Sequence, residues 1–165
     1  MNIFVTGATG FIGSALVNAL LSQNHNVTAL TRSISNARKR LSERVQLIDS
    51  LEELADFNKF DAIINLAGEP IFDRRWTEAQ KARLTDSRLK ITQKLTALIN
   101  ASSSPPHTFI SGSATGYYGN NGEREQDESA PPADNFTARL CRQWEQAAQQ
   151  ARTRVCLVRT GLVLS

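Results

Sequence analysis

The residues best suited to chemistry at the start of the chain are three glycines, Gly7, Gly10 and Gly13, in the segment TGATGFIGS. Glycine has no Cβ, so it permits a sharp turn and lets backbone amides approach a bound group closely. Between a strand and a helix, this spacing is typical of a turn that binds the pyrophosphate of a dinucleotide. The amides and the positive dipole end of the following helix then attract phosphate. The alternative is a purely structural strand-to-helix turn.

A second group of candidate cofactor-binding residues follows the apolar run at residues 27–30. Thr31 and Arg32 stand where a protein specific for NAD usually has Asp or Glu against the ribose hydroxyls. An arginine at this place suits a 2′-phosphate instead, which predicts NADP(H). The alternative is an ordinary surface arginine. Asp49 and Ser50, after the third run, either border an adenine or begin a helix.

Hydroxyl groups follow a later apolar run. Ser113 lies in FISGSATGYYG, and Tyr117 and Tyr118 come soon after it. A serine hydroxyl at the carboxyl end of a strand, near a bound nicotinamide, can polarise a substrate oxygen. Ser113 could equally be a turn residue, and the two tyrosines could line the pocket without reacting.

The elements that must position these residues alternate along the chain. Short β-branched or aromatic runs predict strands at residues 3–5, 27–30, 45–48, 62–66, 108–111 and 155–158. Helical spacing predicts helices after Gly10, at 35–41, at 77–100 and at 136–151, and 116–135 is expected to be an irregular loop. Thr77 and Gln80 have capping-box spacing. The alternation predicts an α/β fold of the Rossmann type: a parallel, doubly wound sheet of at least six strands, apolar on both faces and covered by helices on both sides.

Composition narrows the class of protein. The hydrophobic fraction of 41% and charged fraction of 21% are those of a soluble globular protein, and 165 residues suit one domain. No apolar run is long enough to span a membrane, and no signal peptide is evident, so a cytoplasmic protein is expected. Cys141 and Cys156 lack metal-ligand spacing, so we expect reduced thiols and no metal site. The net charge of +3 is spread along the chain, which favours a small phosphorylated ligand over nucleic acid.

Several ordered blocks resemble one family. They are TGATGFIGS, LTRS, INLAGEPI, RRW followed by SRL, FISGSATGYYG, ARLCRQWEQAA and VRTGLVL. Together they resemble the extended short-chain dehydrogenase/reductases, and within them the atypical branch of nucleoside-diphosphate-sugar epimerase-like proteins. The resemblance implies an NADP(H)-binding domain followed by a C-terminal substrate domain. The chain ends after the sixth expected strand, so we expect a fragment that lacks this second domain and shows no substantial turnover by itself.

The resemblance also implies roles for individual residues. It places the pyrophosphate at Gly7, Gly10, Phe11, Ile12 and Gly13, and the adenosine phosphate at Thr31 and Arg32. Leu66, Ala67 and Gly68 would line the cofactor, and Arg88 matches a position that can reach it, although a helical arginine can also be merely solvated. Ser113 matches the serine that hydrogen-bonds the reacting oxygen in sugar epimerases.

One departure from the family pattern bears on activity. Competent members carry a Tyr-x-x-x-Lys pair at the start of the helix after the loop, in which the lysine lowers the pKa of the tyrosine. Here Phe136 or Thr137 stands near the tyrosine position, and Leu140 or Cys141 near the lysine position. The sequence therefore leaves two hypotheses. One is an NADP(H)-dependent oxidoreductase or epimerase-like protein acting on a hydroxyl or carbonyl compound, with a nucleotide sugar as one candidate. The other is a noncatalytic module that binds or senses NADP(H).

Overall fold

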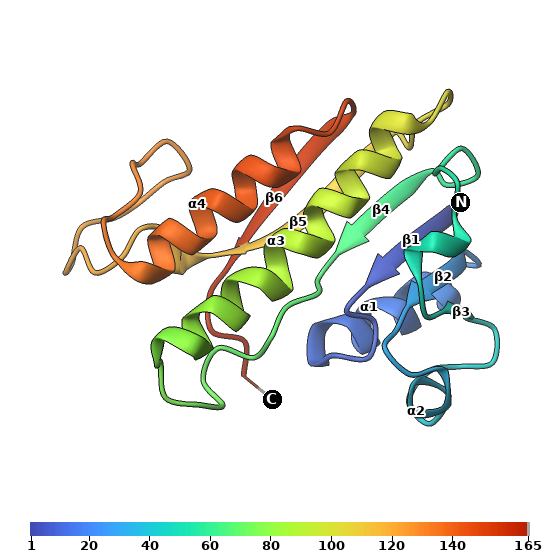
Figure 1. Ribbon diagram of the computed structural model, residues 1–165, viewed down its shortest axis with the longest axis horizontal. Coiled ribbons are helices and arrows are strands. Elements are labelled where there is room, and N and C mark those ends of the chain that lie inside the picture. The colour runs from blue at the N-terminus through green and yellow to red at the C-terminus, as the bar shows by residue number, and fades with distance from the viewer. Residues whose placement is uncertain (165) are drawn as a thin grey trace.

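A single six-stranded sheet forms the centre of the computed structural model, which describes residues 1–164 (Figure 1). The strands are β1 (Asn2–Thr6), β2 (Asn26–Leu30), β3 (Gln46–Ile48), β4 (Ala62–Asn65), β5 (Thr108–Ala114) and β6 (Arg154–Thr160). Their order in the sheet is β3-β2-β1-β4-β5-β6, and every neighbouring pair is parallel. The predicted parallel, doubly wound Rossmann-type sheet is confirmed.

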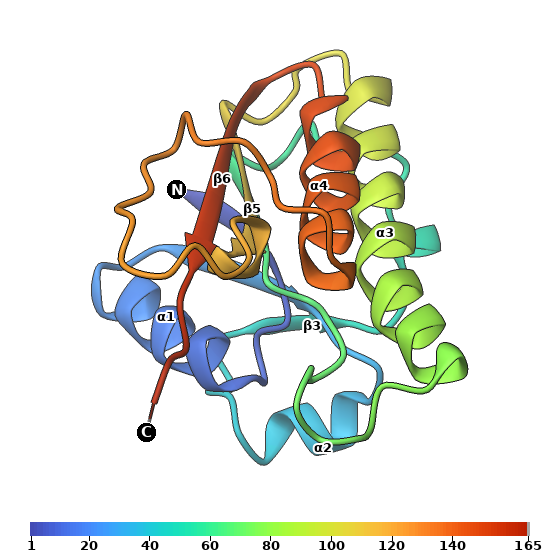
Figure 2. The same cartoon turned by 90° about the vertical axis from the view of Figure 1, so that its left-hand side faces the viewer.

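Helices lie on both sides of this sheet. They are α1 (Phe11–Ser22), α2 (Ile34–Arg38), α3 (Glu78–Ala101) and α4 (Phe136–Gln149), with short 3₁₀ helices at Leu51–Glu53 and Thr115–Tyr117. Figure 2, which looks along the sheet, shows α3 and α4 side by side on one face and α1 on the other. None of the helices described in residues 1–164 is long and apolar enough to cross a membrane.

Two apolar clusters attach these layers to the sheet. Side chains alternate across a strand, so consecutive residues of β1 serve opposite faces. Ile3 and Val5 pack with Val17 of α1, whereas Phe4 packs with Leu95 of α3 on the other face. Because most of these side chains are fully buried, the two clusters fix the helices and, with them, the loops at the carboxyl ends of the strands.

Several predicted boundaries differ from the structure. β3 begins at Gln46 rather than Val45, β4 ends at Asn65 rather than Leu66, and α2 ends three residues before Leu41. β5 continues to Ala114 because it pairs with β6 along its whole length, which no local pattern reveals. Thr77 caps α3 by accepting a bond from the Gln80 backbone N–H (3.2 Å).

The expectation that the strands are apolar on both faces is wrong near their carboxyl ends. Asn65 is fully buried on the face that meets α3; its Oδ1 accepts a hydrogen bond from Thr6 (2.6 Å) and its amide donates one to Thr92 (2.8 Å). The Trp144 indole N–H also donates to Thr92 Oγ1 (2.9 Å). Buried polar groups are tolerated because they are mutually satisfied, and here they tie β1, β4, α3 and α4 together beneath the site.

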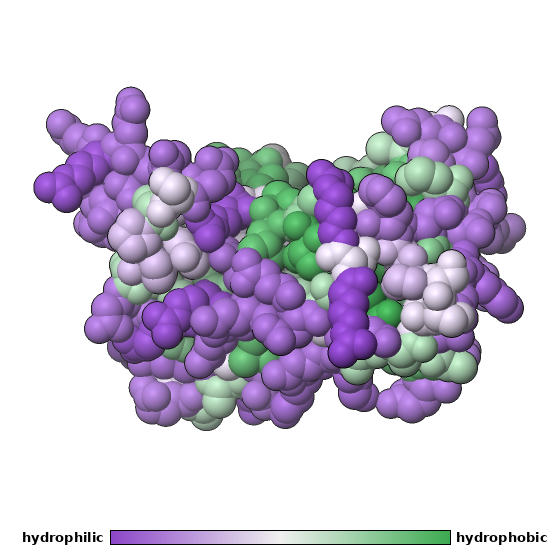
Figure 3. All heavy atoms as spheres, turned by 90° about the horizontal axis from the view of Figure 1, so that it is seen from above, coloured by the Kyte–Doolittle hydropathy of each residue, from purple (hydrophilic) through white to green (hydrophobic). Residues whose placement is uncertain are grey.

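One stretch of the sheet lies open in residues 1–164. Val155 and Leu157 of β6 pack toward the α3 and α4 side, so Cys156 and Val158 face the opposite side. There α1 and α2 pack around β1 to β3, while Cys156 is partly exposed and Val158 is 43% exposed. Figure 3 shows apolar surface between the more hydrophilic ends of the molecule.

Candidate functional site

The site lies where the strands end, on either side of β1. The chain winds outward from β1 through β2 to β3, then returns to place β4 on the other side of β1. In open α/β sheets the crevice at such a switch point, at the carboxyl edge, is where ligands bind. The residues after β1, β2, β4 and β5 therefore face a common region.

The glycine turn has the geometry that its spacing predicts. Gly7 has a positive φ of 71°, and a Cβ there would lie 2.6 Å from the Leu66 backbone. A Cβ on Gly13 would lie 2.1 Å from the Gly7 oxygen, so only glycine lets α1 pack this close to the turn. A Cβ on Gly10 would meet only Gly7 O, at 3.2 Å. The first and third glycines thus prevent severe clashes with the backbone, whereas a side chain on the second would make one tight contact.

The start of α1 is free to receive an anion. Gly10 is its N-cap and offers no side-chain bond, and the first turn has no acidic residue. The exposed side chains of Phe11 and Ile12 stand at this end. Unpaired amides together with the helix dipole favour a phosphate here, so the residues fit the pyrophosphate of a dinucleotide.

Just past β2, where the adenosine phosphate is predicted, Arg32 is exposed. The Thr31 hydroxyl bonds within the turn to Ser33 O (3.2 Å), and the Ser33 hydroxyl caps α2. A second arginine, Arg40, donates to Thr9 O of the glycine turn (3.3 Å), which sequence reasoning missed. After β3, Ser50 rather than Asp49 is the N-cap of the 3₁₀ helix Leu51–Glu53, where it forms a capping box with Glu53.

The residues after β4 contact the glycine turn on one side and α3 on the other. The Leu66 and Ala67 amides bond to Thr6, at 3.2 and 3.3 Å. The Arg88 guanidinium packs against Gly68. A Cβ on Gly68 would lie only 3.0 Å from Arg88 Cζ. The missing side chain of Gly68 thus makes room for Arg88, which α3 brings to the carboxyl edge.

Arg88 is a half-buried cation without a carboxylate partner at salt-bridge distance in the described chain. Its Nη1 donates to Leu84 O (3.0 Å) and its Nη2 to Glu69 O (2.9 Å), both neutral groups. Burial lowers the pKa of Arg88, and the more distant charge of Glu69 opposes this. A desolvated cation at the edge of the crevice is suited to an anionic ligand.

The loop between β4 and α3 is fixed at its far end by aromatic contacts. Trp76 donates its indole N–H to Ile71 O (2.8 Å), and its ring meets the edge of Phe136 with 5.6 Å between centroids. Phe136 is the first residue of α4. Phe136 is one of the two residues near the expected tyrosine position, and its apolar ring packs against this loop.

Ser113 lies at the carboxyl end of β5 and points toward α4. It is 4% exposed, and its hydroxyl donates to Oε1 of Glu145 (2.6 Å), which is itself only 5% exposed. Because a serine hydroxyl has one hydrogen, this bond uses the donor of Ser113 and leaves its acceptor lone pairs. The thiol of Cys141 lies beside Ser113, and burial raises the pKa of that thiol.

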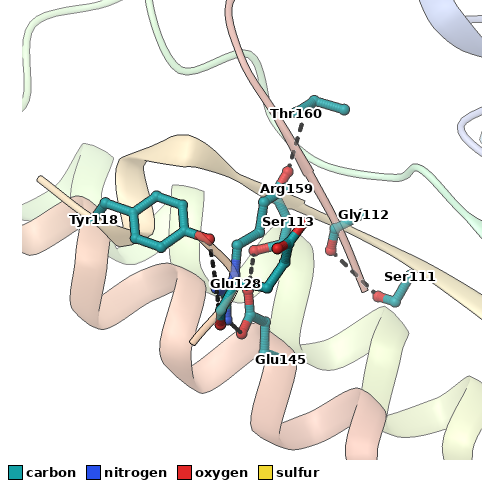
Figure 4. Close-up of polar contacts among 8 residues, drawn as sticks. All are labelled: Ser111, Gly112, Ser113, Tyr118, Glu128, Glu145, Arg159 and Thr160. Carbon is teal, nitrogen blue, oxygen red and sulfur yellow. Dashed lines mark hydrogen bonds and ion pairs between the residues drawn. The ribbon is translucent and has the colours of Figure 1, made fainter. Parts of the chain in front are cut away.

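Arg159 of β6 connects this pair to Tyr118 (Figure 4), and it also contacts Tyr117. Its Nε and Nη2 bind the two Glu145 oxygens, each at 2.8 Å, in a bidentate ion pair. Its Nη1 donates to the Tyr118 hydroxyl oxygen (2.8 Å), and its Cζ lies 3.6 Å from the centre of the Tyr117 ring. The bond with Glu145 raises the pKa of Arg159. Ser113, Tyr117 and Tyr118 thus belong to one cluster centred on an ion pair.

Sequence reasoning did not identify Glu145 or Arg159, although both left a signal. Arg159 is a charged residue near the end of the apolar run VCLVRT. Glu145 falls on the helical stripe that also contains Ala138, Cys141 and Ala148, which are buried. A carboxylate on the apolar stripe of a helix needs a partner, and a single charge in a buried strand supplies one.

The glycine turn at the switch point of a parallel sheet defines a Rossmann dinucleotide-binding domain. Residues 3–164 match the model of the NAD dependent epimerase/dehydratase family, and the chain belongs to this family.

A curated relative from Arabidopsis thaliana, the chloroplastic epimerase family protein SDR39U1 homolog, is 37% identical over 99% of this chain and 49% of its own length. The structure of human epimerase family protein SDR39U1 with NADPH is similar with a TM-score of 0.86 and 34% identity, covering all of this chain and 55% of the human chain. A nucleoside-diphosphate sugar epimerase from Corynebacterium glutamicum gives a TM-score of 0.80 at 30% identity, covering all of this chain and 34% of the other. The chain thus spans about half the length of the curated relatives it matches.

Proposed function

We propose that this chain binds NADP(H) and is the cofactor-binding part of an oxidoreductase or epimerase-like protein that acts on a hydroxyl or carbonyl compound. The observation that carries the proposal is the glycine turn, in which Gly7 and Gly13 are required by close backbone contacts, and which leads into a helix start that has no side-chain cap and no acidic residue. The NADPH in the human relative's structure supports the same cofactor.

Each part of the cofactor has candidate residues. The amides at the start of α1 would hold the pyrophosphate, and Arg32 with Thr31 would receive the 2′-phosphate. Leu66 to Gly68 would line the nicotinamide half, with Arg88 donating from α3 to a phosphate or ribose oxygen. The bound nicotinamide would supply a hydride acceptor or donor, and Ser113 and Tyr118 would orient the substrate oxygen beside it.

A second function is a noncatalytic module that binds or senses NADP(H). Two observations favour it. Neither Phe136, which packs against Trp76 at the start of α4, nor Thr137 supplies the tyrosine that the resemblance places near here, and Ser113 gives its only hydrogen to Glu145. Fold alone does not choose between the two functions, because one fold serves many.

Calorimetric titration with NADPH and NADP⁺ tests cofactor binding directly. We expect binding to both, and no binding to either would refute both functions. A panel of nucleotide sugars and simple carbonyl compounds, followed by NADPH absorbance and by product analysis, then separates them. Where a longer protein contains this chain, it is assayed beside the chain. Turnover would establish the enzyme, and binding without turnover would favour the sensing module.

A further inference from the structure

The ion pair between Glu145 and Arg159 also binds two hydroxyl groups. Glu145 Oε1 accepts from both Ser113 and Arg159 Nε, and its Oε2 accepts from Arg159 Nη2. Arg159 Nη1 is left over, and it reaches away from Glu145 to Tyr118 and to Glu128 O (3.3 Å). The buried pair is thereby satisfied, and its two ends each hold one hydroxyl group in a fixed role.

The pair determines which hydrogen-bonding role each hydroxyl can play. Ser113 donates its only hydroxyl hydrogen to the buried carboxylate of Glu145, which is a stronger acceptor than water. Toward a ligand, the Ser113 oxygen can therefore only accept a hydrogen bond. Tyr118 is in the opposite state. Its oxygen accepts from a guanidinium, and within residues 1–164 its hydroxyl hydrogen has no protein acceptor.

We propose that Glu145 and Arg159 are positioning residues that hold Ser113 as an acceptor and Tyr118 as a donor toward a hydroxyl group of the substrate. This inference rests on the proposed function, because it places both hydroxyls beside a bound nicotinamide. Tyr117 contributes by stacking on Arg159, which keeps the guanidinium in the plane that serves Glu145 and Tyr118 together.

The fixed roles select a chemical class of ligand. An alcohol oxygen can donate its hydrogen to Ser113 and accept one from Tyr118, so it satisfies both groups. A carbonyl oxygen has no hydrogen to donate and satisfies Tyr118 alone. The site therefore favours the alcohol form of a substrate over the corresponding carbonyl form.

The two tyrosines of the chain make the proposal measurable without knowing the substrate. Tyrosine labelled with carbon-13 at Cζ gives two resonances, and Tyr117→Phe assigns them. If Tyr118 faces the nicotinamide, its resonance moves when NADP⁺ is added and stays in place with 2′,5′-ADP, which has no nicotinamide. With NADP⁺ bound, 2-propanol should then move it at a concentration several-fold lower than acetone.

Arg159→Lys separates positioning from cross-linking. Lysine keeps the positive charge beside Glu145. Its single ammonium group, however, lacks the separate guanidinium nitrogens that bind Glu145 and Tyr118 at the same time. We expect NADP⁺ affinity within about three-fold of wild type, with the response of the Tyr118 resonance to NADP⁺ and to 2-propanol lost. Arg139→Lys is the matched control, because Arg139 of α4 forms an exposed ion pair (2.8 Å) with Asp134 of the preceding loop. This variant should respond as wild type does.

The outcomes distinguish the inference from the function on which it rests. Absence of calorimetric binding by wild type overturns both. Binding of NADP⁺ with an unmoved Tyr118 resonance overturns the inference alone, as does a response to acetone at the same concentration as to 2-propanol, or to neither. If Arg159→Lys is unfolded by circular dichroism, the wild-type titrations with the alcohol and the ketone still decide the matter.

Discussion

At the scale of single residues, we predict that the preference for NADPH over NADH depends on Arg32. It is exposed past β2, free to contact a 2′-phosphate. A charge-assisted contact of this kind contributes about 1.5 to 3 kcal/mol, so Arg32→Ala should weaken NADPH binding about ten- to a hundred-fold and leave NADH binding nearly unchanged. Calorimetry with both cofactors measures this.

Arg44→Ala is the control for Arg32. Arg44 is also an exposed arginine, but it lies with Asn2 and Asn26 at the other end of the strands. Equal affinities of the wild-type chain for NADPH and NADH would contradict the role given to Arg32.

Gly10 and Gly13 should fail in different ways when they are replaced. A Cβ on Gly10 would meet only Gly7 O, at 3.2 Å, so Gly10→Val should still fold and lose cofactor binding where the branched side chain blocks the pyrophosphate. A methyl group at Gly13 would lie 2.1 Å from Gly7 O, so Gly13→Ala should lower the melting temperature by displacing α1. Thermal unfolding with and without NADPH separates the two effects, and a Gly10→Val protein that still binds would show that phosphate binds elsewhere.

At the scale of elements, α4 and β6 are joined by a buried ion pair whose loss should be costly. Arg159→Met leaves the Glu145 carboxylate buried without its cation, which we expect to lower the free energy of unfolding by about 3 to 5 kcal/mol. Glu145→Leu combined with Arg159→Met should recover part of this loss. Arg139→Met, at an exposed pair, should cost about 1 kcal/mol or less. Urea unfolding compares the three, and equal effects of the two single changes would contradict the argument.

The stability that Arg159 contributes should show little dependence on pH. Glu145 raises the pKa of Arg159 in the folded state above its value in the unfolded chain. A raised pKa of a cation gives stability that is fully present below the unfolded pKa and is lost only as pH rises through the folded one. Because both values lie far above neutrality, the contribution of Arg159 should stay constant from about pH 6 to about pH 9.

The elements show which parts of the structure the sequence can predict. The glycine turn and the order of strands and helices are local patterns, so they could be predicted from single segments. The pairing of Glu145 with Arg159, and of Asn65 with Thr92, depends on elements that meet only after the sheet has formed. The resemblance implies that Arg88 can reach the cofactor. The packing of its guanidinium against Gly68, however, depends on where α3 lies relative to the segment after β4.

At the scale of the whole molecule, one of the apolar surfaces that residues 1–164 leave uncovered lies at Cys156 and Val158 of β6. Exposed apolar patches promote association, so we expect this chain to self-associate as its concentration rises. Val158→Lys should shift sedimentation toward the monomer, whereas Gln146→Lys, at an exposed position of α4, should not. A wild-type chain that remains monomeric at high concentration would show that the area is too small to matter.

Trp144 gives the molecule an optical property as well as a structural one. Its indole is buried between Thr92, Arg88 and Gly112, directly beneath the crevice. Indole emission overlaps the absorption band of dihydronicotinamide and not that of the oxidised ring. A reduced cofactor bound above Trp144 should therefore quench its fluorescence by energy transfer, while an oxidised one leaves it bright. The unlabelled protein would then report the redox state of its ligand by its own emission, and Trp144→Phe, with only Trp76 remaining, would lose most of that signal.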